Sequence, residues 1–387
     1  MSADLKQQVI AWRRHLHSHP ELSHQEYQTS QYIYDQLITF PHLEVKRMTK
    51  TSVCAFLKGT KTEGTGHTIL LRADIDALPI QEEADVPFKS QNPGVMHACG
   101  HDAHPAMLLG AAKALAERGT DFNGEIRFVF QHAEEVTPGG AAELVALGIT
   151  EGVDYAFALH VNPDYEAGQF AMKDGKLTSA ADDFEIKIFG RGSHASMPEV
   201  AVDPLVIGSE IVMALQTIVS RKMPILSAPV LTVAKFHCGT ALNIIADTAE
   251  LGGTIRSLDA KVRVDARQHL ETIVTSIATM HGARAEISWE LGCPSVTNDA
   301  KLTELSRQIA GDIVGEKGVI ELPAPMFGTE DFADFSEAVP SSMQFIGVHN
   351  PSFGEVFPLH HPRFKLDEEA LIYGARYFEN IARTLCP

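Results

Sequence analysis

Basic residues, signal-like segments and long apolar runs are scarce in this sequence. Lys and Arg number 32 against 50 Asp and Glu, which leaves a net charge of −18. A surface of that sign repels phosphate backbones and anionic membranes, so we expect neither nucleic acid nor a membrane as a partner. The N-terminal residues lack the apolar core of a secretion signal, and no stretch is expected to approach a membrane span in length and apolar content.

Cysteine is also sparse, and its pattern excludes a disulfide framework. The five cysteines, Cys54, Cys99, Cys238, Cys293 and Cys386, are odd in number and scattered through 387 residues. This is typical of a reduced, soluble, cytoplasmic protein. The length and an apolar content of 44% predict two domains with a sizeable core.

Strands and helices alternate along the first part of the chain. Apolar periodicity predicts a first helix from about residue 5 that ends near Pro20, and further helices at about 25–39, 103–117 and 139–147, with Asp102 as the cap of the third. Apolar runs predict strands at 53–57, 68–73, 125–131 and 155–159. This alternation predicts an α/β fold, a mostly parallel sheet with helices on both faces.

The middle of the chain has a different rhythm. Predicted strands at 184–189, 230–236, 249–256 and 284–290 flank predicted helices at 204–220 and 262–280. The order β-α-β-β-α-β is that of a ferredoxin-like unit, so we assign 181–292 to an inserted domain. The α/β pattern resumes with a helix at 302–314, a strand at 343–348 and a helix from about 367. Residues 1–180 and 293–387 therefore form one discontinuous domain.

Residues able to bind metal follow the predicted strands of the first domain. Cys99 and His101 are two residues apart, Glu134 and Glu135 follow one strand, and His160 ends the next. The carboxyl ends of parallel strands meet at one edge, where α/β sheets place their chemistry. Thiolate, imidazole and carboxylate together suit Zn²⁺ or related ions.

Each of these residues also has a plainer reading. A buried histidine is commonly a hydrogen-bonded core residue, a Glu-Glu pair is commonly solvated, and an intracellular cysteine is commonly a small apolar side chain. Cys99 beside histidines also admits a cysteine nucleophile. No G-x-S-x-G elbow or P-loop is present, so serine hydrolases and nucleotide hydrolases have no motif here.

An ordered set of motifs spans nearly the whole chain. The segments are 13–17 (RRHLH), 19–23 (HPELS), 71–79 (LRADIDALP), 96–102 (MHACGHD), 131–135 (QHAEE), 159–160 (LH), 190–198 (GRGSHASMP), 328–332 (GTEDF) and 359–362 (LHHP). This set resembles the hippurate hydrolase and indole-3-acetyl-amino-acid hydrolase group of N-acyl amino acid amidohydrolases. That group lies within the carboxypeptidase G and aminoacylase superfamily of metallopeptidases. The segment 96–102 is the most specific.

The resemblance implies a two-metal hydrolase with a glutamate base. The implied metal ligands are Cys99, His101, Glu135, His160 and His360. Five ligands suit two ions better than one, and the Cys99 thiolate is the expected bridge. Glu134 is the implied general base, which takes a proton from water and passes it to the leaving amine. Mixed S, N and O ligands accommodate Zn²⁺ or Mn²⁺, and also Co²⁺ or Ni²⁺.

Further roles follow from the same resemblance. Asp76 is expected to orient a ligand histidine, with the capping of a turn as the alternative, while Asp74 is not expected to bind metal. His194 is expected to stabilise the tetrahedral intermediate in a partner subunit. Asn243 and Arg256 are expected to bind the substrate carboxylate. Related chains often carry Asn-x-Ile-Pro, and here Ala replaces the proline.

The sequence therefore predicts a cytoplasmic enzyme that hydrolyses the amide bond of small N-acyl amino acids. A homodimer formed through the inserted domain is expected from the resemblance. The nearest alternative is a metallo-dipeptidase or exopeptidase with the same site. A non-catalytic metal- or ligand-binding protein and a cysteine hydrolase using Cys99 are the other classes.

Overall fold

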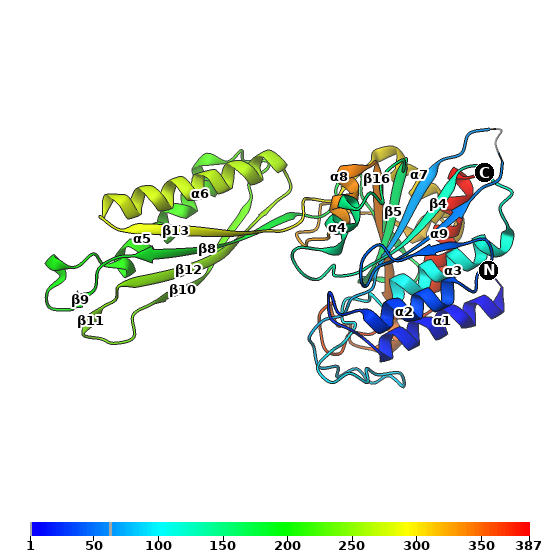
Figure 1. The fold of residues 1–387 in the computed structure, drawn as a ribbon, viewed down its shortest axis with the longest axis horizontal. Helices are drawn as coiled ribbons and strands as arrows, with labels where there is room; N and C mark the ends of the chain where they lie inside the picture. Colours follow the sequence, from blue (N-terminus) through cyan, green and yellow to red (C-terminus); the bar gives the residue numbers. More distant parts are fainter. Residues whose placement is uncertain (1, 62–63) are drawn as a thin grey trace. The chain divides into compact units, whose positions relative to one another are not determined.

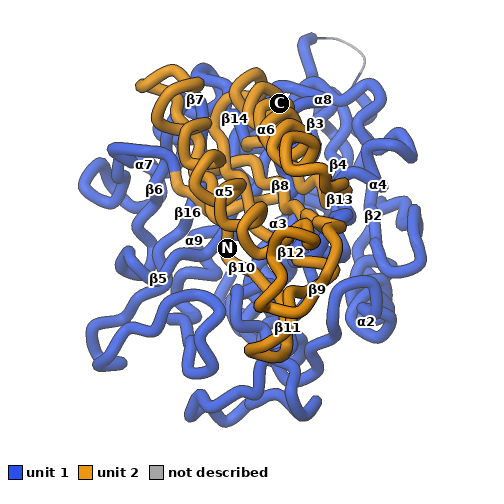
Figure 2. Tube along the Cα trace, turned by 90° about the vertical axis from the view of Figure 1, so that its left-hand side faces the viewer, with its two compact units in different colours: residues 1–177, 296–325, 331–387 blue, residues 178–295, 326–330 orange. Residues whose placement is uncertain are grey.

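The chain divides into two compact units (Figure 2). The computed structural model describes residues 2–61 and 64–387. Unit 1 comprises Met1–Leu177, Val296–Pro325 and Asp331–Pro387, and unit 2 comprises Thr178–Ser295 and Met326–Glu330. Unit 2 therefore takes in 326–330, which the sequence interpretation assigned to the first domain. That segment lies between β15 and α8 and forms no helix or strand, so periodicity gave no signal for it.

Unit 1 is built on an eight-stranded sheet (Figure 1). In spatial order its strands are β1 (Glu44–Lys46), β2 (Val53–Lys58), β4 (Glu125–Gln131), β3 (Thr68–Asp74), β5 (Tyr155–Glu166), β16 (Ser341–His349), β6 (Phe170–Met172) and β15 (Val319–Glu321). The four central strands, β4, β3, β5 and β16, are parallel to one another. The predicted mostly parallel sheet is confirmed. A small ladder pairs β7 (Gly175–Lys176) with β14 (Thr297–Asn298).

Helices cover both faces of this sheet, as predicted (Figure 1). One side carries α1 (Ala3–Ser18), α2 (Tyr27–Leu37), α3 (Ala103–Arg118) and α9 (Ala370–Leu385). The other side carries α4 (Gly140–Ala146) and α8 (Phe332–Ala338). The helix α7 (Ala300–Val314) packs against α9 and β16. The first ten residues of α3 are all buried, because this helix is apolar around most of its surface.

One strand boundary differs from the prediction in a way that matters for the site. The strand expected at 155–159 continues to Glu166, so His160 lies inside β5 and does not end it. Residues 156–161 pair in parallel register with β16, which comes from far along the chain and gives no local signal. His160 is therefore placed by a regular ladder, opposite Phe345.

Unit 2 has the predicted ferredoxin-like fold. Its antiparallel sheet has the order β10 (Val230–Cys238), β12 (Thr248–Ser257), β8 (Ala180–Phe189) and β13 (Arg284–Leu291). Buried and exposed residues alternate along β8, so one sheet face packs on α5 (Pro204–Thr217) and α6 (Ala260–Met280). A ladder of β9 (Ser193–His194) and β11 (Ile244–Ile245) completes the unit.

The expectation that no stretch is as apolar as a membrane span is wrong. Residues 204–222, comprising α5 and a π-helical turn, Ile218–Lys222, are long and apolar enough to cross a membrane by length and composition alone. Ile207, Ile211 and Leu215 on this helix are buried in the unit 2 core. The apolar character of α5 is thus explained in part by packing on the four-stranded sheet.

Candidate metal centre

The segment before α3 brings Cys99 and His101 to the edge of the sheet. Gly100 between them has φ +86°, a backbone conformation that favours glycine. A Cβ atom on Gly100 would lie 2.3 Å from Val161 Cγ2. Glycine is therefore required here for two reasons, the left-handed turn and the close approach of β5. Both neighbouring side chains are buried.

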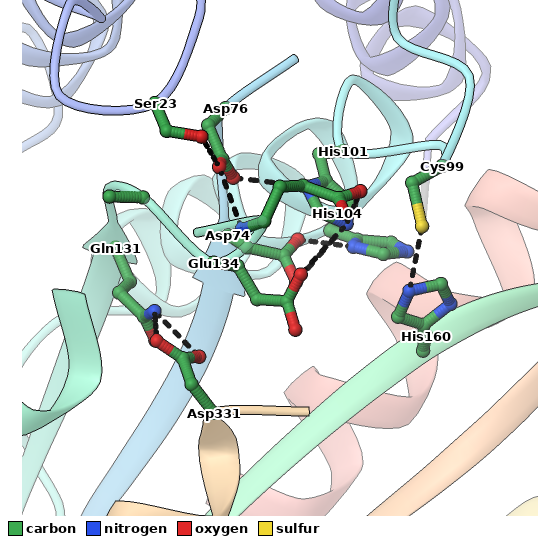
Figure 3. A network of polar contacts seen from close by, with 12 residues as sticks. Ser23, Asp74, Asp76, Cys99, His101, His104, Gln131, Glu134, His160 and Asp331 are labelled. Atoms are coloured by element: carbon green, nitrogen blue, oxygen red, sulfur yellow. Dashed lines mark hydrogen bonds and ion pairs between the residues drawn. The ribbon is translucent and has the colours of Figure 1, made fainter. Parts of the chain in front are cut away.

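All five predicted metal ligands converge within unit 1. One donor atom from each of Cys99, His101 and Glu135 lies within 4.8 Å of the others. The Cys99 Sγ is 3.5 Å from His160 Nε2 and 3.3 Å from His360 Nε2 (Figure 3 shows the first contact). His360 Nε2 is also 3.4 Å from Glu135 Oε1. The thiol therefore lies between two imidazoles.

Asp76 contacts one of these histidines directly. Its Oδ1 is 3.1 Å from His101 Nδ1 (Figure 3). A carboxylate accepts, so Nδ1 of His101 carries a proton, and Nε2 is the ring nitrogen that faces the donor cluster. The other oxygen of Asp76 accepts from the Ser23 hydroxyl at 2.7 Å and from the Glu135 backbone N–H at 3.0 Å. Asp76 thus ties β3, the 97–102 segment and the Glu135 loop together.

The electrostatics of the site favour a cation. Burial lowers the pKa of His101, but the nearby carboxylates of Asp74 and Asp76 outweigh burial and raise the pKa to about 10. Burial raises the pKa of the Cys99 thiol well above its ordinary value, and the carboxylates of Glu135 and Glu134 raise it further. A reactive cysteine needs a lowered pKa, so this environment argues against a free thiolate nucleophile.

The residues present fit divalent metal ions. Among the described residues, the buried atoms His101 Nε2 and Glu135 Oε1 have no hydrogen-bond partner. Buried polar atoms are rarely left without one, and a cation would satisfy both. Sulfur, nitrogen and oxygen donors gathered from several elements match the ligand chemistry of zinc and related metals.

Glu134 lies beside these donors. Its Oε2 is 4.0 Å from His101 Nε2, and its side chain is only 10% exposed. The residue before it, Ala133, has φ +51°, so the chain turns sharply at the end of β4. Because of that turn, the side chains of the adjacent residues Glu134 and Glu135 both lie beside the donor cluster that includes His101. Two carboxylates from neighbouring positions thereby lie near His101 Nε2.

The predicted capping role of Asp102 is wrong. The helix does begin at Ala103, but the Asp102 side chain makes no capping hydrogen bond. Its Oδ2 lies 2.7 Å from Arg13 Nε and 2.8 Å from His17 Nδ1. A fully buried carboxylate needs an opposite charge more than a cap, and α1 supplies it. Asp102 therefore fixes the metal-binding segment against α1.

The three predicted residues of unit 2 fall into two places. His194 lies on β9, opposite Ile244, and Ala195 N–H donates to the Asn243 carbonyl, so His194 and Asn243 are neighbours. Asn243 is followed directly by β11, so the missing proline still leaves a paired strand. Arg256 lies near the C-terminal end of β12, opposite Ala181. Its Nη1 donates to Thr254 Oγ1 at 2.6 Å.

The family is decided by the sequence match. The family model for peptidase family M20/M25/M40 matches residues 70–384. The chain belongs to this family. An N-acyl-L-amino acid amidohydrolase from Geobacillus stearothermophilus is 48% identical over 295 residues, which are 76% of this chain and 79% of that protein. The resemblance read from the motifs is confirmed.

Two further proteins are similar to this M20 chain along nearly its full length. N-acetyl-L-cysteine deacetylase from Bacillus subtilis is 38% identical over 382 residues, covering 98% of this chain and 89% of that protein. A dinuclear metal-binding peptidase of the M20 family from Bacillus subtilis has the same fold, with a TM-score of 0.84 and 34% identity over 99% of each chain. The candidate metal centre of unit 1 thus lies in a family with a known two-metal member.

Sequence reasoning missed the side chains that support the site. Ser23 and Arg72 lie in the motif segments 19–23 and 71–79 but had no role assigned to them, and Glu26 and His104 lie outside the motifs. Their partners are up to 259 residues away in the chain. Besides the motifs, charge was a signal for Arg72, because this residue stands inside an apolar run that predicts a buried strand.

Proposed function

We propose that this M20 protein hydrolyses the amide bond of small N-acyl amino acids with the help of two divalent metal ions. The products are a carboxylic acid and a free amino acid. The observation that carries this proposal is the position of Glu134 beside the donor atoms of Cys99, His101 and Glu135. A donor cluster alone supports binding, and a carboxylate beside it supports hydrolysis.

In this proposal the residues that would hold the ions are Cys99, His101, Glu135, His160 and His360. Zn²⁺ or Mn²⁺ suits this donor set, as do Co²⁺ or Ni²⁺. When bound, the ions supply a Lewis acid for the amide carbonyl and lower the pKa of the attacking water. Glu134 accepts the proton of that water and delivers it to the nitrogen of the leaving amine. Asp76 keeps His101 in the tautomer that presents Nε2 to the ions.

Unit 2 provides the proposed substrate contacts. His194 donates to the developing oxyanion in the site of a second copy of the chain, so the enzyme works as a homodimer. Its proposed location is the cytoplasm. Asn243 and Arg256 bind the α-carboxylate of the substrate, for which a guanidinium is suited by its paired donors. Both groups select a substrate with a free α-carboxylate, which separates this reaction from general amide hydrolysis.

A substrate panel tests the proposal. Purified protein loaded with one metal at a time is assayed on N-acetyl and N-benzoyl amino acids and, in parallel, on dipeptides with the same C-terminal residues. We expect faster turnover of the acylated substrates. Faster turnover of dipeptides would instead assign a metallo-dipeptidase, and no turnover with full metal content would assign a binding protein.

Chelation separates the metal and thiol mechanisms. We expect a chelator to remove activity and added metal to restore it, while a thiol reductant restores nothing. Recovery by reductant alone would assign the chemistry to Cys99 as a nucleophile. Metal content measured on the same samples links each activity to the number of ions bound.

A further inference from the structure

A row of buried polar side chains lies behind the donor cluster in unit 1. Arg72 on β3 is only 1% exposed. Its Nη1 is 2.7 Å from Asp74 Oδ2, and its Nη2 is 2.7 Å from Asp331 Oδ1. The guanidinium supplies the opposite charge that two buried carboxylates need. The remaining oxygen of Asp74, Oδ1, makes a short hydrogen bond with His104 Nδ1 (Figure 3).

The hydrogen bonds of His104 determine its protonation. The backbone N–H of Val161 lies 3.0 Å from His104 Nε2 and can only donate. Nε2 must therefore offer its lone pair, and the ring proton of a neutral imidazole is on Nδ1, where Asp74 accepts it. Both nitrogens of His104 are then used. The ring has no lone pair left for a metal ion.

The backbone carbonyl of the same residue, Val161, also contacts a predicted metal ligand. The Val161 carbonyl lies 2.8 Å from His160 Nδ1 and can only accept, so His160 carries its proton on Nδ1. The lone pair on His160 Nε2 then faces Cys99 Sγ, 3.5 Å away. Val161 thus donates its N–H to His104 Nε2, and its carbonyl accepts the ring proton of His160.

We propose that Arg72, Asp74 and His104 are positioning residues that fix Val161, and through it the direction of His160 Nε2, and that neither Asp74 nor His104 is a metal ligand. This inference rests on the proposed metal-dependent function. It decides between two donor groups, because Asp74, His101, His104 and His160 also lie close enough together to hold an ion. Asp74 Oδ2 faces His101 Nε2 at 3.7 Å, but that oxygen already accepts from Arg72.

Metal titration of the full-length protein tests the inference. The variants are Asp74→Asn and His104→Gln, and the matched control is His67→Gln, just before the opposite end of β3 from Asp74. Cobalt is the probe, because its visible spectrum reports both thiolate ligation and geometry. Equivalents bound at saturation and the affinity of each site are measured on protein first freed of metal.

We expect both variants to bind two equivalents of cobalt at saturation, as the wild type does, with one site weakened roughly 10–100-fold. The thiolate absorption is retained, and His67→Gln matches the wild type. Loss of a whole equivalent in either variant would make the substituted residue a ligand. Unchanged cobalt affinity at both sites in both variants would contradict the positioning role of Asp74 and His104. A wild-type protein that binds no cobalt overturns the proposed function itself, before any variant is compared.

A second pair of variants tests the route through Val161. Glutamine at position 104 places an amide oxygen near the former Nε2, whereas His104→Asn places an amide nitrogen near the former Nδ1. We expect the smaller loss of cobalt affinity in His104→Gln, since it can still accept from Val161. Equal losses, or the reverse order, would contradict this route. If the histidine variants do not fold, Asp74→Asn alone decides between ligand and positioning residue.

Discussion

The Glu26 carboxylate accepts a hydrogen bond from the backbone N–H of Ala133, with Oε1 2.8 Å from the nitrogen. Glu26 precedes α2, is fully buried, and also accepts from the His24 N–H at 3.0 Å. Ala133 has the left-handed φ of +51° and directly precedes Glu134. A carboxylate from the N-terminal segment therefore helps to hold the turn that presents the proposed base.

This carboxylate predicts a pH dependence of stability. Burial raises the pKa of Glu26 from 4.5 to about 7. Between those values the folded protein keeps a proton that the unfolded chain has lost, so the free energy of unfolding falls as pH rises. Glu26→Gln removes this titration. We expect the variant to gain up to about 3 kcal/mol relative to the wild type between pH 4.5 and pH 8.

Urea unfolding of chelator-treated protein at several pH values measures this difference. The exposed Glu337→Gln serves as the control and should track the wild type across the range. A Glu26→Gln variant whose stability difference from the wild type stays constant with pH would show that Glu26 ionises normally in the folded protein.

Gly100 predicts a second outcome, with an internal control. Gly94 has φ +79° and open space around its Cβ position, whereas Gly100 has φ +86° and meets Val161. Gly94→Ala should cost roughly 1–2 kcal/mol from the backbone alone. Gly100→Ala adds overpacking of about 1–3 kcal/mol and displaces Cys99 and His101, so metal affinity should fall as well. Thermal unfolding and metal titration of both variants measure this, and equal effects would contradict the role of the close approach.

Asp76 predicts a third outcome. Burial alone would raise the pKa of Asp76, but the hydrogen bond from His101 outweighs burial and leaves the pKa below its ordinary value. Asp76→Asn should lower metal affinity roughly 10–100-fold, because His101 Nδ1 loses its charged acceptor. Ser23→Ala removes only the hydroxyl contact to the same carboxylate and should have a smaller effect. Metal competition titrations rank the two, and a larger loss in Ser23→Ala would refute the assignment.

Local patterns were enough to predict most of the fold. The apolar run of β3, the continuous apolar surface of α3 and the alternation along β8 each reflect burial by neighbouring layers, which periodicity records directly. Strands of three residues, such as β1 and β6, carry too few positions to show a period. The end of β5 was missed because its partner β16 lies almost 200 residues later.

The site was predictable for its donors and not for their supports. Cys99 and His101 stand in a motif, so family resemblance places them at once. Asp102 was misread because a carboxylate before a helix is usually a cap, and its pairing with Arg13 depends on how α1 packs. Glu26 and His104 act through backbone groups of Ala133 and Val161, and a backbone contact leaves no trace in the sequence of either partner.

The central claim, a glutamate base beside a two-metal centre, is tested most directly by Glu134→Gln. Turnover of an N-acyl amino acid and bound metal are measured on the same sample. We predict two metal equivalents per subunit, as in the wild type, and a fall in kcat of roughly 10²–10⁴-fold. Full metal content with kcat within tenfold of the wild type would contradict the account.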